Sequence, residues 1–208
     1  MKKHFVTGIG DVPKPGQSDL WPIFIPTAVS LISCINKAGR TNIIPLTGWG
    51  VLCRYPFMIG IGICNGRYSE LYYRRHSYDM IKETMEFVFN VPDKSLEKAI
   101  SVTGSLTAND PKIDKWKEAN LTPVPSTMIK SPMIAECPLN YECVVRQFIV
   151  TGGSHDIFIG EVVAAHLYGE IVKAGALESV NEWLFKPYEK EPVKKLTWTT
   201  LPTFEKEE

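Results

Sequence analysis

The sequence has no excess of either charge and none of the common nucleotide-binding motifs. Of its 208 residues, 23 are Lys or Arg and 23 are Asp or Glu, so the formal net charge is zero. A chain without net charge creates no long-range field that would attract nucleic acid or an anionic membrane. No G-x-G-x-x-G sequence follows a predicted strand and no P-loop sequence occurs, which argues against a Rossmann unit and a P-loop site.

Signatures of metal sites, hydrolases and membrane proteins are missing as well. No H-E-x-x-H sequence and no zinc-like spacing of Cys and His occurs, so we predict no metal site. The serines lack the G-x-S-x-G context of a hydrolase nucleophile. No apolar run reaches the roughly 18 residues of a membrane-spanning helix, and the lysines near the start precede no apolar stretch. We therefore expect neither a membrane segment nor a signal peptide.

Cysteine is present but not paired. The five cysteines are an odd number, and none forms a C-x-x-C motif. Three of them lie in apolar, strand-like runs, where a free thiol packs as a small hydrophobic group. Reduced cysteines are typical of the cytoplasm, so we expect a cytoplasmic protein in which the cysteines are not the redox centre. They are Cys34, Cys53, Cys64, Cys137 and Cys143.

Short apolar runs of strand length dominate the chain, and the helical segments between them are short. That order favours a mainly β fold, a closed antiparallel barrel, over a doubly wound parallel sheet. We expect one domain over residues 1–208, with a proline-containing N-terminal arm and a tail after Gly169. The predicted strands are 27–36, 42–51, 57–64, 87–91, 134–150 and 156–166, and the predicted helices begin at Ser77, near Asp93 and near Lys112.

The segment Asn42–Gly50 is the least regular of the predicted strands. Pro45 removes one backbone amide, and Gly48 and Gly50 flank Trp49. Amides in such an irregular strand end are free to face a ligand instead of a partner strand. The alternative is an ordinary bulge at the rim of a barrel.

A basic segment, 74–77, directly precedes the first predicted helix. A helix N-terminus offers free amides and the positive end of the helix dipole, so Arg75 with Ser77 could form a phosphate site. The alternative is a solvated loop in which Ser77 simply caps the helix. His155, at a strand start after two glycines, could donate a hydrogen bond to a ligand or be a turn residue without a role.

Two other features of the strands invite a functional interpretation. Gly60 and Gly62 fall on one face of a strand, because side chains alternate, and could form a flat shelf. Glu136, Glu142 and Glu161 lie in apolar runs, where paired carboxylates could perform acid–base chemistry. More often, alternation places such residues on the solvent face.

Taken in order, these segments resemble the flavin reductase-like proteins with an FMN-binding split barrel, and flavoredoxins in particular. The resemblance covers roughly residues 26–166 and rests on the order and spacing of several pieces. These are SLISCIN, GRTNIIPLTGWG, a proline before FMIGIGIC, SYDMIKETMEFVFNVP, DKWKEANLTP, ECPLNYEC and HDIFIGEVVAAH. The sequence departs from the family pattern at Asn65–Tyr73, which looks like an insertion.

The resemblance implies a Greek-key split barrel with short flanking helices that forms a homodimer and holds one FMN in each cleft near the interface. It places Asn42 and the 42–50 segment against the flavin ring and His155, the candidate catalytic residue, over it. The other cofactor-binding residues it implies are Thr47, Gly48 and Trp49 near the ring, Arg75, Ser77 and Lys115 at the phosphate, and Tyr188 from the tail as a cover.

The function that follows is reduction of an acceptor through FMN, with NAD(P)H as the electron donor. The acceptor would be a small molecule or a protein. The alternative within the family is a non-enzymatic FMN electron carrier of the flavoredoxin type. A barrel used only for binding, such as a nucleic-acid module, is disfavoured by the zero net charge. The apolar run 144–150 suggests that part of one strand faces a partner subunit.

Overall fold

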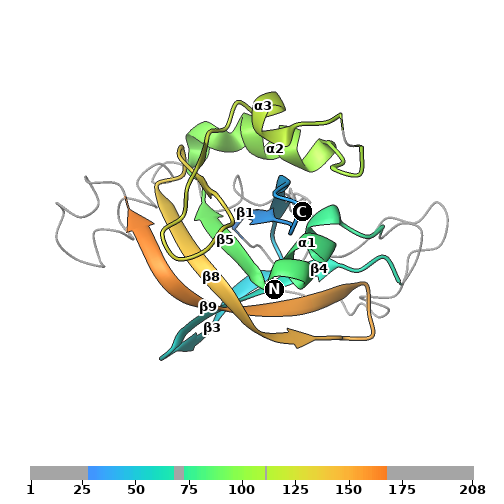
Figure 1. Ribbon diagram of the computed structural model, residues 1–208, viewed down its shortest axis with the longest axis vertical. Helices are drawn as coiled ribbons and strands as arrows, with labels where there is room; N and C mark the ends of the chain where they lie inside the picture. Colours follow the sequence, from blue (N-terminus) through green and yellow to red (C-terminus); the bar gives the residue numbers. More distant parts are fainter. Residues whose placement is uncertain (1–27, 68–72, 111, 168–208) are drawn as a thin grey trace, which may run out of the picture.

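The computed structural model describes residues 28–67, 73–110 and 112–167, and its main feature is a curled antiparallel sheet of seven strands (Figure 1). The strand order is β2-β1-β5-β8-β9-β4-β3. The strands are β1 (Ser30–Ile35), β2 (Thr41–Leu46), β3 (Trp49–Arg54), β4 (Phe57–Cys64), β5 (Glu86–Val91), β8 (Leu139–Ile149) and β9 (His155–Leu167), and β6 (Pro123–Val124) pairs with β7 (Met133–Ile134). The helices are α1 (His76–Thr84), α2 (Glu97–Ser105) and α3 (Lys115–Glu118), with the 3-10 turn η1 (Lys94–Leu96) before α2.

The connections confirm the predicted fold class. Three hairpins join consecutive strands: β1 with β2, β3 with β4, and β8 with β9. The remaining neighbours, β1 with β5, β5 with β8 and β4 with β9, are distant in sequence, as Greek-key connections produce. No described helix is long and apolar enough to span a membrane.

The interior of the curled sheet is filled by side chains from the strands and from α1, which lies inside the curve of the sheet (Figure 1). β1 and β2 are buried on both faces, because Ile32 and Ile44 belong to this core while Leu31 and Ile43 pack in a second core with α2 and with Trp116 of α3. Burial on both faces explains why these strands are apolar almost throughout. Completely buried members of the main core are Ile32, Cys34, Ile61, Ile63, Ile81, Phe87, Cys143 and Phe158.

The predicted strand 42–51 is in fact two strands. β2 ends at Leu46 and β3 begins at Trp49, and the chain between them crosses from the β1 side of the sheet to the β4 side. The carbonyl of Gly48 accepts a 2.7 Å hydrogen bond from the amide of Gly62, which holds the end of the crossing against β4. The irregularity seen in the sequence therefore marks the place where the barrel closes.

Two other element boundaries differ from the prediction. The long strand begins at Leu139 instead of 134, because the Cys137 amide turns back to the Ile134 carbonyl and leaves Met133–Ile134 to pair with β6. The third helix is only Lys115–Glu118, because Asp114 caps it by accepting from the Trp116 and Lys117 amides.

The start of α1 differs from the alternative in which Ser77 caps the helix. The N-cap residue is Arg75, whose extended backbone leads into the helix and whose side chain makes no capping hydrogen bond. Ser77 is instead the second helical residue and is completely buried. The backbone amides in the first turn of α1 therefore donate no hydrogen bond to the side chain of the N-cap residue.

Candidate functional site

The end of β4 brings three of the predicted site residues together. Gly48 is hydrogen-bonded to Gly62, and a Cβ placed on Gly62 would lie 4.0 Å from the Cβ of His155. His155 faces Cys64 across the β4–β9 pairing, and the amide of Arg75 donates to the Cys64 carbonyl over 3.2 Å. Gly48, His155 and Arg75 therefore surround one strand end, although more than 100 residues separate the first from the second.

The predicted glycine shelf on β4 has close neighbours. A Cβ on Gly60 would lie 2.5 Å from the side chain of Leu52, and a Cβ on Gly62 would lie 3.5 Å from the Gly48 carbonyl oxygen. The absence of a side chain at Gly60 therefore makes room for Leu52 on β3, whereas the separation at Gly62 is an ordinary van der Waals contact.

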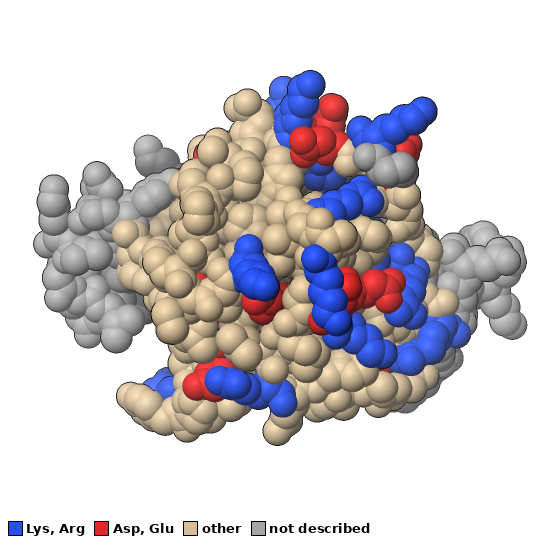
Figure 2. Space-filling model, viewed as in Figure 1, with Lys and Arg blue, Asp and Glu red and all other residues tan. Residues whose placement is uncertain are grey.

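Positive charge is concentrated around this strand end. Burial lowers the pKa of His155, and the charge of Arg75 lowers it further. Burial also lowers the pKa of Lys115, to about 8, and Arg75 again contributes. Arg75 is therefore electrostatically close to both groups. On the face in Figure 2, basic side chains lie around α1 and the adjoining segments with acidic side chains among them, whereas the opposite half of this view is mostly uncharged.

A buried donor or acceptor without a partner lies in the same region. The Nε2 atom of His76 is buried and has no hydrogen-bond partner, and it is the one such side-chain atom among the residues that the structure describes. Burial lowers the pKa of His76, and the charges of Arg40 and Lys115 contribute. Because buried polar atoms are nearly always hydrogen-bonded, this nitrogen indicates that a ligand or solvent belongs here.

Lys115, the first residue of α3, contributes a buried positive charge to the site. Its side chain is buried, and its ammonium donates to the carbonyls of Thr103 at 2.8 Å and Ile43 at 3.2 Å. An ammonium has three N–H donors, so one remains for a further acceptor. The Asp114 cap and the packing of Trp116 fix the helix turn that carries it.

Asn42 and Ser77 form a buried hydrogen-bonded pair near the Lys115 ammonium. The side-chain amide of Asn42 donates to the Ser77 hydroxyl over 2.7 Å, and both residues are almost fully buried. This contact ties the start of β2 to the start of α1. The sequence placed both residues in the site, and the structure brings them into direct contact.

The remaining predicted residues are placed differently. The Trp49 ring packs edge-on against Phe89 at a centroid distance of 4.9 Å, and its Nε1 donates to the Ala28 carbonyl. The indole therefore joins the barrel core, away from His155. Thr47 lies half-buried in the crossing beside Gly48. Tyr188 lies outside the described residues.

Hydrogen bonds and an ion pair that no sequence pattern predicted join the segment after β4 to the hairpin that carries His155. Asn65 donates from its backbone to the Ser154 carbonyl and from its side chain to the Gly153 carbonyl, both over 2.9 Å. Arg67 forms an ion pair with Asp156, which is completely buried. The segment predicted to be an insertion is thus fixed at its base to the residues beside His155.

Asp156 is the centre of this network. It accepts from the Tyr78 hydroxyl over 2.7 Å and from the Thr151 amide over 3.2 Å, in addition to Arg67. Burial alone would raise its pKa, but these hydrogen bonds and the Arg67 charge hold the pKa below its usual value. Alternation from the buried Phe158 could have identified Asp156 as an inward-facing carboxylate.

The cysteines are free, as predicted, and four of the five are buried. Burial raises the pKa of Cys34 to about 12 and raises that of Cys137 well above its usual value. Such thiols react poorly, because the thiolate is the reactive form. No cluster of potential metal ligands occurs among the described residues.

The arrangement is suited to binding an anion. Arg75 and Lys115 supply positive charge and hydrogen-bond donors, the His76 Nε2 atom is without a partner, and Gly48 and His155 lie at the same strand end. A phosphate group is an anion of this kind. The residues present therefore fit the phosphate end of a flavin mononucleotide.

Solved structures share this fold. Nitrilotriacetate monooxygenase component B from Bacillus cereus is 24% identical and has a TM-score of 0.66, covering 82% of this chain and 85% of its own. A flavoredoxin from Methanosarcina acetivorans is 23% identical and has a TM-score of 0.64, covering 81% and 83%. At these identities the likenesses establish the fold.

Sequence comparison points the same way. An uncharacterized protein of Archaeoglobus fulgidus is 34% identical over 120 residues, which are 58% of this chain and 61% of that protein. This chain thus spans less than two thirds of that relative's length. The family model described as a flavin reductase like domain matches residues 24–180, about three quarters of the sequence. The chain therefore belongs to the flavin reductase like domain family.

Proposed function

We propose that this protein binds FMN non-covalently and uses it to transfer electrons from NAD(P)H to a small-molecule or protein acceptor. The observation that carries the proposal is the pair of positive charges at Arg75 and Lys115, with the unpartnered Nε2 atom of His76, next to His155 and Gly48. Flavoredoxins and an FMN-binding protein from Thermus thermophilus occur among the structural relatives, in support of a flavin.

Different residues would bind the phosphate and the ring of FMN. Arg75 and Lys115 hold the phosphate through charge-assisted hydrogen bonds, and Asn42 with Ser77 supports the helix start behind them. The crossing with Thr47 and Gly48 borders the ring, while Trp49 anchors that crossing to the core through Phe89.

His155 would orient the ring and not act as a proton donor. Its pKa is lowered by burial and by Arg75, so the imidazole is neutral at pH 7 and offers one donor and one acceptor. FMN, when bound, supplies a hydride acceptor that returns electrons singly or in pairs. The protein contributes binding and orientation, for which a neutral histidine suffices.

The test is direct. The full-length protein should purify yellow, and anaerobic NADH or NADPH should bleach its absorbance near 450 nm. A bleached flavin shows that the protein accepts electrons from a nicotinamide. A yellow protein that neither nucleotide bleaches, but that a reduced carrier protein does, would establish the alternative of a non-enzymatic FMN electron carrier. A protein that binds no added FMN would refute the proposal.

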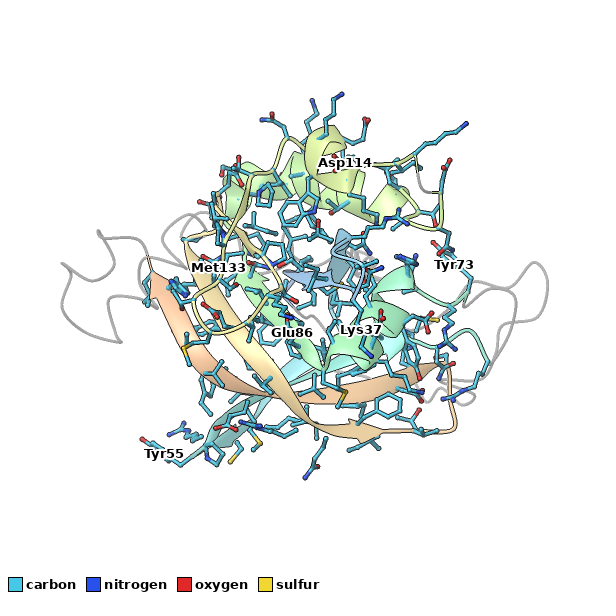
Figure 3. The ribbon with its side chains drawn as sticks, in the orientation of Figure 1. Lys37, Tyr55, Tyr73, Glu86, Asp114 and Met133 are labelled. Atoms are coloured by element: carbon cyan, nitrogen blue, oxygen red, sulfur yellow. The ribbon has the colours of Figure 1, made fainter. Side chains whose placement is uncertain are left out.

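We also propose that the protein is a cytoplasmic homodimer. Exposed apolar side chains gather on β3 and at the end of β8: Val51 is 54% exposed, Leu52 56% and Val150 57%. Tyr55, at the outer tip of the β3–β4 hairpin, is 92% exposed and points away from the barrel (Figure 3). Such side chains are suited to a partner surface. Sedimentation should give twice the chain mass of 23.4 kDa, and a monomer that retains FMN would contradict the dimer.

A further inference from the structure

We infer that Tyr73 positions Arg75 for the phosphate and thereby sets the preference for FMN over riboflavin, an inference that rests on the proposed function. Tyr73 belongs to the segment that departs from the family pattern and lies just before α1 (Figure 3). The guanidinium carbon of Arg75 lies 4.3 Å from the centre of the Tyr73 ring, and Arg75 also donates a hydrogen bond to the Tyr73 hydroxyl. Ring and hydroxyl together hold the guanidinium in one orientation.

The other arginines near this helix start are already neutralised. Arg74 forms a two-point ion pair with Asp79, and Arg67 pairs with the buried Asp156. Within the described ranges, no carboxylate lies at ion-pair distance from Arg75. Of these three arginines, Arg75 is thus the one whose charge is available for an anion.

An aromatic partner leaves that charge intact where a carboxylate would cancel it. The contact of a guanidinium with an aromatic face restrains the side chain without neutralising it. The Arg75 amide donates to the Cys64 carbonyl opposite His155, and the charge of Arg75 lowers the pKa values of Lys115 and His155, so Arg75 lies within electrostatic range of both groups. Tyr73 therefore reduces the ordering cost of Arg75 on binding.

Arg75 is directed at the phosphate, so the consequence should appear in ligand preference. Riboflavin has the same ring system as FMN and no phosphate. A change that disorders Arg75 should weaken FMN binding and leave riboflavin binding unchanged. Loss of folding or of a ring contact would weaken both.

The experiment measures dissociation constants of the flavin-free, full-length protein for FMN and riboflavin by quenching of flavin fluorescence. Tyr73→Ala should raise the FMN constant by about five- to tenfold, the scale of restraining one long side chain. Tyr73→Phe, which keeps the ring, should raise it by about two- to threefold. Arg74→Ala is the matched control and should leave the ratio of the two constants within about twofold of wild type.

A double variant identifies the path of the effect. If Tyr73 acts through Arg75, Tyr73→Ala should add nothing to Arg75→Ala. A full Tyr73→Ala effect in the Arg75→Ala background, or an equal loss of FMN and riboflavin binding, would overturn the inference. If Arg75→Ala weakens FMN binding but Tyr73→Ala does not, the inference fails and the proposed phosphate site stands. If Arg75→Ala leaves the ratio unchanged, the proposed phosphate site itself fails.

Discussion

Replacement of Glu142 by Gln is expected to lower the free energy of unfolding by about 3–4 kcal/mol, the cost of breaking a buried, charge-assisted network. Glu142 lies on β8 with a completely buried side chain. It accepts hydrogen bonds of 2.7 Å from the Thr127 amide, the Thr127 hydroxyl and the Met128 amide, and one of 3.1 Å from the Ile129 amide. Glutamine would place its side-chain NH2 group, a donor, against backbone amides that are themselves donors, and those hydrogen bonds would be lost.

The same carboxylate predicts how stability changes in acid. Burial alone would raise the pKa of Glu142, but hydrogen bonds from Thr127, Met128 and His166 outweigh it and lower the pKa to about 2. Its contribution is therefore fully present above the ordinary value near 4.5 and is lost as the pH falls toward 2. The difference between wild type and Glu142→Gln should shrink over this range.

Urea unfolding at pH 7, 4 and 2.5 measures this difference. The matched control is Glu161→Gln on the neighbouring strand β9, where Glu161 pairs with the half-exposed Arg146. We expect about 0.5 kcal/mol or less from the control. An equal effect of the two substitutions, or a Glu142→Gln effect that is constant with pH, would contradict the assigned network.

Glu142 also shows where sequence reasoning reached its limit. Alternation correctly puts it on the face opposite to Cys143, which lies in the core. That face was expected to be solvated, but residues 127–131 cover it and direct successive amides at Glu142 and at Glu86 on β5. A pattern of period two shows the face of a residue but not which distant loop covers that face.

In the candidate site, too, local sequence patterns identified single segments but not the contacts between distant segments. The basic segment at α1 and the start of β9 were evident locally, because helix starts and hairpin signals depend on neighbouring residues. Their meeting at the end of β4 depends on pairings between distant strands, such as Cys64 with His155. The inward orientation of Trp49 likewise follows from its pairing with the buried Ile61. No local pattern specifies such a register.

Replacement of Lys115 by Met is expected to raise the FMN dissociation constant by about 30- to 100-fold at pH 7, the worth of one hydrogen bond from a charged donor to a phosphate. Lys115 is buried, and two backbone carbonyls already hold its ammonium in place. Its third N–H can therefore donate to a phosphate without a further loss of side-chain entropy. Met keeps the length of the side chain and removes the charge. Riboflavin binding should change little, because riboflavin lacks the phosphate.

The pH dependence of the same affinity makes the assignment specific. The pKa of Lys115 is lowered to about 8, chiefly by burial, so the free protein begins to lose this charge just above neutral pH. A bound phosphate raises that pKa, and FMN affinity is therefore greatest below pH 8 and declines as the pH rises through the free and then the bound value. Lys115→Met should show no such decline between pH 7 and pH 9.5, because no group titrates at that position.

Lys117 provides the matched control. It lies on the same turn of α3, is exposed, and carries the same charge. Lys117→Met should bind FMN within about twofold of wild type and keep the decline above pH 8, because an exposed charge is screened by solvent. Thermal unfolding of both variants establishes that each is folded at the temperature of the titration. If Lys115→Met retains wild-type FMN affinity, or loses affinity equally for riboflavin, Lys115 is a packing residue and the phosphate must be held elsewhere.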